Sequence, residues 1–368
     1  MRGNANRRTT SGVRIALTAA VALCAVTAVL PGGASADDTA AADDGGAGVE
    51  RVSVAPDGTQ ADDNSTGASI TPDGSHVVFS SSATNLTPDD TTRGVRVFVR
   101  DQLAGQTARM GSLAPVQPPV ISGDGAYVAY PVQWFNDVRI RQYQVSTGRT
   151  VSVDCWPSCN QPSLSADGRY TAYAVLVRQP SPGQRIEVVD WQTGAKQTGA
   201  TLGHTLASKP SISGDGRYVA YQDGAAQDVF VWDRTAGTTS GPIEGPSQAA
   251  TLVQLSDDGS KVVHLSGADT YVSDTSSGTT QLVPNVRGVA IDPTGRYLLY
   301  APNDTNGPSL VLRDLQTGTD ETVSNQPASA GTDAVSADGR EVVFQSAADD
   351  IVPGDTNGKS DVFVRRFS

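Results

Sequence analysis

The sequence is short of the residues that most often carry catalysis. Its 368 residues include three histidines, His76, His204 and His264, which are scattered along the chain. The HExxH, G-x-S-x-G and P-loop spacings do not occur, and nothing pairs a cysteine with a histidine. We therefore predict no catalytic residue, and the composition leans against an enzyme.

Positive charge is also scarce. The chain has 27 Lys and Arg residues against 39 Asp and Glu residues, which gives a formal net charge of −12. Removal of the first 36 residues takes away four arginines and no acidic residue, and so makes the balance −16. An acidic surface repels phosphate groups, so we expect no nucleic acid and no membrane association.

The first 36 residues differ from the rest. Four arginines precede a mostly apolar segment, residues 15–30, and Ala34-Ser35-Ala36 follows as a small-residue cleavage pattern. We predict a signal peptide over 1–36, cleaved near Ala36, because the apolar segment is too short for a confident membrane anchor. Arg7-Arg8 leaves a twin-arginine signal open, and Cys24 leaves a lipidation site open.

The segment after this signal is acidic and rich in small residues. Residues 37–48 read DDTAAADDGGAG, without periodicity, which predicts a disordered leader. An exported chain of this kind is secreted or held at the cell surface, and we expect a monomer.

Cysteine is rare as well. Once Cys24 leaves with the signal, Cys155 and Cys159 remain, in the sequence CWPSC. Two cysteines in an exported protein predict a disulfide. A loop this short fixes local shape more than it stabilises the whole fold.

Repetition, by contrast, is abundant. Seven segments share an apolar strand, a turn containing glycine and an alternating second strand, at 68–79, 119–130, 162–173, 210–221, 253–264, 289–300 and 334–344. Repeats begin 36–51 residues apart, a period typical of β-propellers, in which each repeat forms one four-stranded blade. We predict an all-β, seven-bladed β-propeller over 49–368.

The fourth repeat shows how a blade is built. We expect an inner strand at 210–213, a second strand at 217–221, a third at 228–233 and an outer strand from about 238. The last repeat stops after its third strand, whereas residues 49–54 resemble an outer strand. We therefore predict that this N-terminal strand completes the last blade and leaves no sheet edge there.

These repeats resemble the TolB-like, WD-repeat-like β-propeller family. The resemblance lies in segments such as PSISGDGRYVAY (210–221) and DIVPGDTNGKSDVFVRR (350–366), and it extends over nearly all of 49–368. It implies a propeller that serves largely as a protein-interaction module, with some members that are hydrolases or lyases. The lyases use a histidine-rich central metal site, which three scattered histidines do not support.

Three aromatic residues are the candidate ligand-binding residues. Trp134 and Phe135 fall in the loop between the second and third strands of one blade, and Trp156 falls in the link to the next blade. Both kinds of loop emerge on the same face of a propeller, so the three side chains are expected to be neighbours. Exposed, rigid aromatics suit the binding of a peptide or sugar; local packing is the alternative.

Calcium is the one candidate cofactor. Asp355, Asn357 and Asp361 occupy positions 1, 3 and 7 of a loop that resembles a calcium loop. Against this, Lys359 stands where an acidic ligand is usual and no closing glutamate follows, so ordinary turn chemistry is the alternative.

Taken together, the sequence favours an exported, non-enzymatic binding module. Its partner is expected to be a protein or a wall-associated glycan, bound on the long-loop face. One alternative is a secreted lyase or glycan hydrolase that uses carboxylates at the mouth of the central channel. A second is a calcium-stabilised structural surface protein. Inward-facing carboxylates of raised pKa around a deep central pocket would favour the enzyme.

Overall fold

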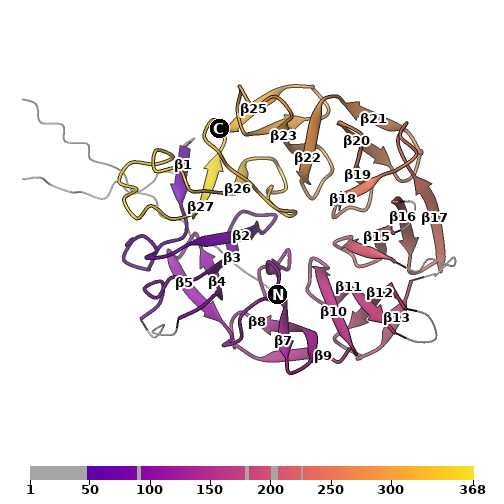
Figure 1. Cartoon of the computed structure of the whole chain (residues 1–368), viewed down its shortest axis with the longest axis horizontal. Coiled ribbons are helices and arrows are strands. Elements are labelled where there is room, and N and C mark those ends of the chain that lie inside the picture. The colour runs from indigo at the N-terminus through magenta and orange to yellow at the C-terminus, as the bar shows by residue number, and fades with distance from the viewer. Residues whose placement is uncertain (1–47, 89–92, 179–181, 200–205, 225–226) are drawn as a thin grey trace, which may run out of the picture. The chain divides into compact units, whose positions relative to one another are not determined.

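The described residues of the computed structural model form antiparallel sheets arranged around a common centre (Figure 1). The structure describes residues 48–88, 93–178, 182–199, 206–224 and 227–368. The predicted signal peptide, the predicted leader up to residue 47, and His204 lie outside these ranges. No helix in the described part of the chain is long and apolar enough to cross a membrane.

All regular structure in these ranges is β. The strands are β1 (Gly48–Arg51), β2 (Ser65–Ile70), β3 (His76–Ser81), β4 (Arg96–Asp101), β5 (Gln106–Met110), β6 (Val120–Ile121), β7 (Tyr127–Trp134), β8 (Asp137–Gln144), β9 (Thr150–Val153), β10 (Ser158–Leu164), β11 (Tyr170–Val177), β12 (Gly183–Asp190), β13 (Lys196–Thr198), β14 (Ser208–Ile212), β15 (Tyr218–Asp223), β16 (Asp228–Asp233), β17 (Thr238–Ile243), β18 (Thr251–Leu255), β19 (Lys261–Ser266), β20 (Asp269–Asp274), β21 (Thr280–Val283), β22 (Val286–Ile291), β23 (Tyr297–Pro302), β24 (Leu310–Asp314), β25 (Asp320–Ser324), β26 (Glu341–Ser346) and β27 (Asp361–Arg366).

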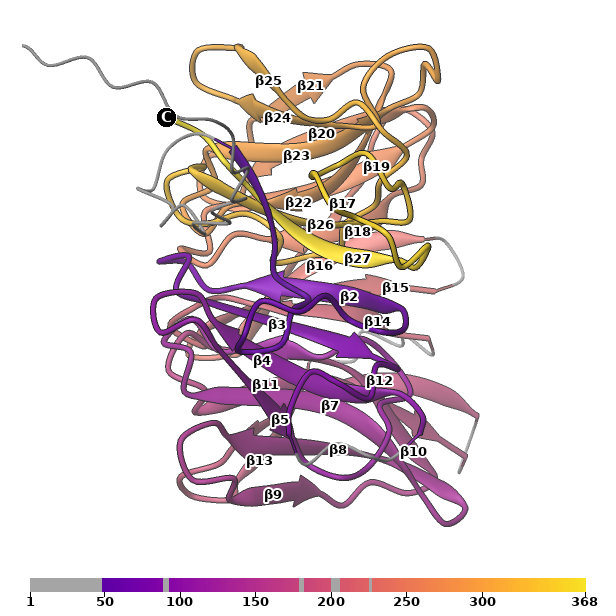
Figure 2. The same ribbon diagram turned by 90° about the vertical axis from the view of Figure 1, so that its left-hand side faces the viewer.

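These strands form repeated sheets in chain order. Four sheets have four strands each: β2–β5, β14–β17, β18–β21 and β22–β25. Strands β6–β13 form an eight-stranded sheet, whose halves meet at one parallel pairing of Ser158 with Val138. The predicted four-stranded sheet of the fourth repeat is confirmed, because β14–β17 follow the expected order. Figure 2 shows the sheets from the side, stacked next to one another.

The repeated turn explains why the inner two strands of each sheet form a hairpin. In the fourth repeat, Asp215 Oδ1 accepts hydrogen bonds from Ser213 Oγ (2.6 Å) and from the Arg217 N–H (2.8 Å). Gly216 adopts φ +72°, and a Cβ there would lie 2.3 Å from the ring of Tyr170. Only glycine meets both constraints without strain.

The N-terminal strand completes the last sheet, as predicted. β1 pairs antiparallel with β27, which in turn pairs with β26, so Gly48 lies opposite Arg366 and Arg51 opposite Phe363. Both ends of the described chain therefore belong to one sheet. This pairing covers an edge of β27 that would otherwise present unpaired backbone groups.

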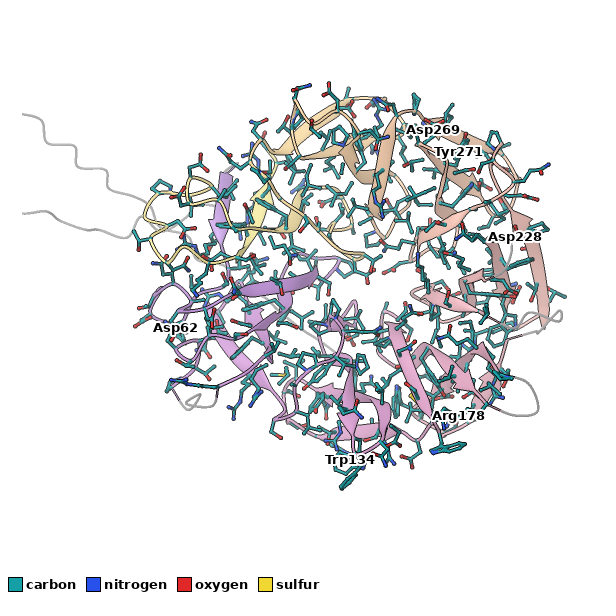
Figure 3. The ribbon with its side chains drawn as sticks, viewed as in Figure 1. Asp62, Trp134, Arg178, Asp228, Asp269 and Tyr271 are labelled. Atoms are coloured by element: carbon teal, nitrogen blue, oxygen red, sulfur yellow. A yellow bond between two sulfur atoms is a disulfide. The ribbon has the colours of Figure 1, made fainter. Side chains whose placement is uncertain are left out.

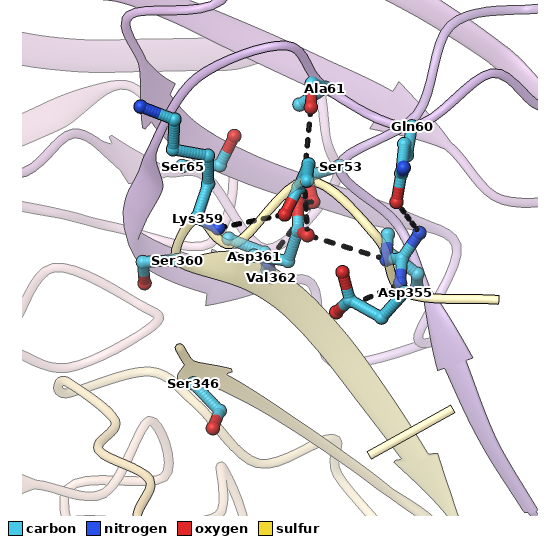
Figure 4. A network of polar contacts seen from close by, with 12 residues as sticks. Ser53, Gln60, Ala61, Ser65, Ser346, Asp355, Lys359, Ser360, Asp361 and Val362 are labelled. Carbon is cyan, nitrogen blue, oxygen red and sulfur yellow. Dashed lines mark hydrogen bonds and ion pairs between the residues drawn. The ribbon is translucent and has the colours of Figure 1, made fainter. Parts of the chain in front are cut away.

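A buried polar network reinforces this junction (Figure 4). Arg51 Nη2 lies 2.9 Å from Asp355 Oδ2, and Arg51 Nε lies 3.5 Å from Asp361 Oδ2. Ser53 Oγ donates to Asp361 Oδ1 at 2.6 Å. The Asp361 side chain is fully buried, and burial raises its pKa. The Arg51 guanidinium therefore balances a carboxylate that has no access to water.

We predict that Arg51→Ala destabilises the fold by about 3 kcal/mol or more, because it leaves a buried carboxylate without its counter-charge. The measurement is equilibrium urea unfolding. Arg340→Ala is the matched control, since Arg340 pairs with Asp338 on the surface and its loss should change stability by less than about 1 kcal/mol. Equal, small effects of the two substitutions would contradict this role of Arg51.

Another buried polar side chain, His264, lies in the core of the β18–β21 sheet. Its ring is fully buried and stacks on Tyr271, with 5.5 Å between centroids. Neither ring nitrogen has a hydrogen-bond partner among the described residues, and burial lowers the pKa of His264 to about 4. The equivalent cross-strand pairs Phe79–Phe98 and Phe344–Phe363 are wholly apolar.

His264→Phe is expected to stabilise the fold by about 1–2 kcal/mol at pH 7, because it removes two unpaired buried nitrogens. The gain in unfolding free energy should increase as the pH falls from 6.5 towards 4. Over that range the unfolded wild-type histidine takes up a proton while the folded one stays neutral, so the wild type loses stability. Urea unfolding at pH 7 and pH 5 measures both effects, and a gain that does not grow at pH 5 would refute the assignment.

Candidate functional site: the central channel

The inner strands of the sheets surround a central cavity. Its volume is about 530 Å³, within the range typical of ligand sites. Five of the six sheets contribute lining residues, and residues 330–333, which precede β26, contribute the rest. The residues of this cavity are therefore brought together by the arrangement of the sheets around a common centre.

Three successive repeats place an equivalent residue at the wall of this cavity, each directly before a proline: Gln117, Gln161 and Lys209. The Gln161 N–H donates to Gln117 Oε1 at 2.8 Å, and the Lys209 N–H donates to Gln161 Oε1 at 2.8 Å. Gln161 and Lys209 have φ of 55° and 51° and lie at bulges in β10 and β14. A bulge redirects a side chain relative to the regular pleat.

Two cations face the same cavity. Lys209 and Arg287 both line it and are exposed to it, and neither forms an ion pair with another described residue. Burial lowers the pKa of Lys209, and the charge of Arg287 lowers it further. Two neighbouring positive charges without counter-ions, in a chain of net charge −12, form a local site for an anion.

The deeper end of the channel carries acidic side chains. A smaller chamber of about 30 Å³ is lined by Asp257 and Asp333, and Asp333 also lines the larger cavity. Gln254 Nε2 donates to Asp333 Oδ1 at 2.7 Å. Burial raises the pKa of Asp333 to about 6. Burial, and then the charges of Asp333, Asp258 and Asp292, raise the pKa of Asp257 to about 7.

The repeated turns also line the narrow chamber that holds these acids. The Asp124 N–H donates to the Ala166 carbonyl (2.9 Å), the Ala166 N–H to the Gly214 carbonyl (2.8 Å), and the Gly214 N–H to the Asp257 carbonyl (2.7 Å). Each bond links one repeat to the next. The backbone of Asp257 is thus tied to the turn of the preceding repeat, which fixes the position of this residue at the narrow chamber.

The predicted aromatic residues lie elsewhere, at the outer edge of the sheets. Figure 3 shows Trp134 at this edge. Trp134 and Phe135 are in contact edge to face, with 5.4 Å between centroids. Trp156 is 74 % exposed, in a loop closed by the predicted Cys155–Cys159 disulfide, which is confirmed. No contact between Trp156 and Trp134 occurs among the described residues.

The predicted calcium residues are brought together, but around a protein cation. Asp355 and Asp361 contact Arg51, and Asn357 Nδ2 donates to Asp361 Oδ2 at 2.9 Å. Asn357 Oδ1 accepts the backbone N–H of Lys359 at 2.8 Å, as in an ordinary Asx turn. A calcium ion at this loop would have to displace the Arg51 guanidinium.

Sequence reasoning missed Lys209, Arg287, Asp257 and Asp333. A signal for Lys209 was present, because QPP at 117–119, QPS at 161–163 and KPS at 209–211 are three versions of one position in the repeat. A lysine that replaces glutamine in one copy marks a departure from the repeat.

Comparisons with known proteins establish the fold. No family model matches the chain, and no curated protein matches it. An oligogalacturonate lyase solved in complex with manganese matches with a TM-score of 0.63 and 14% identity, over 89% of this chain and 94% of that one. An oligogalacturonate lyase from Vibrio parahaemolyticus matches with a TM-score of 0.60 and 13% identity, over 83% and 90%. TolB from Acinetobacter baumannii matches with a TM-score of 0.47 and 17% identity, over 69% and 61%. The two lyase matches show that the chain has a β-propeller fold, as its repeats predicted.

The manganese in one of these structures raises the question of a metal here. Within the described residues, no group of three His, Cys, Asp or Glu side chains is placed to hold a metal ion. The channel offers Asp257 and Asp333, but none of its described lining residues is a histidine. The described residues therefore do not fit such a centre.

We predict that Asp257→Asn stabilises the protein at pH 8 by roughly 2 kcal/mol and changes it little at pH 4. Between pH 3.8 and about 7 the unfolded aspartate ionises while the folded one stays protonated, so the wild type loses stability as the pH rises. Unfolding free energies at the two pH values measure this. Asp349→Asn, at an exposed position, is the charge-matched control. An equal gain at both pH values would show that Asp257 is not a buried acid.

Proposed function

We propose that the protein binds an acidic oligosaccharide in its central channel. The observation that carries this proposal is the pair Lys209 and Arg287, two cations without acidic partners among the described residues, which face one cavity. A sugar carboxylate would supply the missing negative charge. Charge-assisted hydrogen bonds of this kind are about twice as strong as neutral ones.

The rest of the cavity suits a hydroxylated ligand. Its wall offers the amides of Gln117 and Gln161 and the hydroxyls of Ser69, Ser163 and Thr332 beside prolines and small apolar residues. Polar groups of this kind fix the orientation of a ligand in a site that is otherwise apolar. The two matching lyases are named for oligogalacturonate, a saccharide with one carboxylate per unit, which supports this class of ligand.

A second candidate function is cleavage of the same saccharide, as a lyase or a hydrolase. It is favoured by the two channel acids, Asp257 and Asp333, whose pKa values of about 7 and about 6 suit proton transfer near neutral pH. We place binding first because the wide cavity is lined by both cations but by only one of the two acids, Asp333, whereas Asp257 lines only the narrow chamber. Release of an unsaturated product or a new reducing end, abolished by Asp333→Asn, would establish the enzyme instead.

The localisation, the oligomeric state and the number of blades are proposed from the sequence. We propose an exported monomer, released or kept at the cell surface after cleavage near Ala36, with a propeller over 49–368. We also propose seven blades: the eight-stranded sheet counts as two, and residues 332–335, beside β26, act as the inner strand of the last blade.

Lys209→Ala is expected to weaken the binding of trigalacturonate about tenfold or more, because a charge-assisted contact is worth roughly 1.5–3 kcal/mol. Arg287→Ala should act similarly, and binding to the parent should weaken as salt is raised. Isothermal titration calorimetry on residues 37–368 measures both effects.

Lys196→Ala is the control, since it removes the same charge from the outer strand β13, outside the cavity. If Lys209→Ala and Arg287→Ala leave the affinity unchanged, the channel is not the binding site. The same holds if Lys196→Ala loses as much affinity as these two variants. Absence of binding by the parent would overturn the ligand class.

A further inference from the structure

The outer edge of the β6–β13 sheet combines exposed aromatic rings with cations. We call Trp134, Phe135, Arg141, Trp156 and Arg178 the aromatic edge. The Phe135 side chain is 84 % exposed and the Trp156 side chain 74 % exposed. Figure 3 shows Trp134 and Arg178 on the same part of the outer edge. Exposed apolar side chains that gather in one part of a surface, unlike single ones, are typical of a contact surface.

Each tryptophan carries an arginine against its ring. The guanidinium of Arg141 lies 4.9 Å from the ring centroid of Trp134, and that of Arg178 lies 5.4 Å from the centroid of Trp156. Neither arginine forms an ion pair with any described residue. Two arginines that form no ion pair among the described residues, each next to an aromatic ring, offer positive charge to a carboxylate.

The edge is also braced, so that its rings are held in place before a ligand arrives. Arg139 contacts Asp137 (3.0 Å) in the Trp134 hairpin and Asp154 (2.8 Å) just before the Trp156 loop. The disulfide from Cys155 to Cys159 closes that loop. Side chains fixed in this way lose little entropy on binding.

The edge is continuous with the channel along two strands. Trp156 lies just before β10, and Gln161, five residues further on, lines the cavity, a span of about 16 Å at most in extended chain. The second connection follows β7, where the Pro131 carbonyl accepts a hydrogen bond from the Val116 N–H at 2.9 Å. Gln117, the next residue, lines the cavity, while β7 continues to Trp134.

From these observations we propose that the aromatic edge is an extension of the channel site for a longer chain of the same acidic glycan. This rests on the proposed function. One end of the polymer occupies the channel beside Lys209 and Arg287, and later units cross the edge. Their apolar faces contact Trp156 and Phe135, and their carboxylates pair with Arg141 and Arg178. Two linked contacts raise the affinity for a polymer above that for a short oligomer.

The experiment compares trigalacturonate with polygalacturonate on the chain 37–368, with a neutral polysaccharide of similar length as the control ligand. We expect the parent to bind the polymer at least about tenfold more tightly than the trimer. Trp156→Ala and Arg178→Gln should remove this difference and leave the affinity for the trimer unchanged. Leu103→Ala, an exposed apolar side chain outside the edge, should change neither affinity.

The outcomes separate the two proposals. If the edge variants keep the full advantage of the polymer, or if the neutral polymer binds as tightly, the edge proposal is overturned while binding of the trimer still supports the channel. If the parent binds neither ligand, both proposals fail. We expect parent and variants to have equal melting temperatures, because both changed side chains are exposed. Equal melting temperatures would exclude unfolding as the cause of a loss of affinity.

Discussion

The pairing of β1 with β27 is the constraint on which the rest of the structure depends. It joins the two ends of the described chain in one sheet, and Arg51 holds that junction through two acidic partners. The central cavity is lined by residues from Gly67 to Asp333, so it exists only while the sheets stay in place around it. Stability at the junction and binding in the channel are therefore linked.

The charges of the channel are arranged along its length. Lys209 and Arg287 line the wide cavity, and Asp257 and Asp333 line the narrow chamber. Burial makes the charged forms of Lys209, Asp257 and Asp333 costly, so the pKa of the lysine is lowered and those of the two aspartates are raised. An anionic ligand in the wide cavity would neutralise the cations and stay apart from Asp257, whereas Asp333 lines both spaces. The two cations would attract an anionic ligand to the wide cavity, and the two acids would repel it from the narrow chamber.

Much of the fold could be predicted from the sequence, because the repeat encodes it locally. The Asp-Gly turn at 215–216 and the strands around it depend on residues a few positions apart, and the closing strand showed as a missing outer strand in the last repeat. The channel site depends instead on residues far apart in the chain. Lys209 and Arg287 line one cavity only because the sheets surround a common centre, and their spacing in the chain carries no signal. The neighbourhood of Asp355 and Asp361 was predicted, but not Arg51, whose position there follows from the pairing of β1 with β27.

The central claim is that the channel beside Lys209 and Arg287 is the ligand site. The most direct test is a crystal structure of residues 37–368 grown with trigalacturonate. We expect a saccharide in the channel, with a carboxylate within hydrogen-bond distance of the Lys209 ammonium or the Arg287 guanidinium. A saccharide bound only outside the channel, with the cavity beside these two cations left to water, would contradict it.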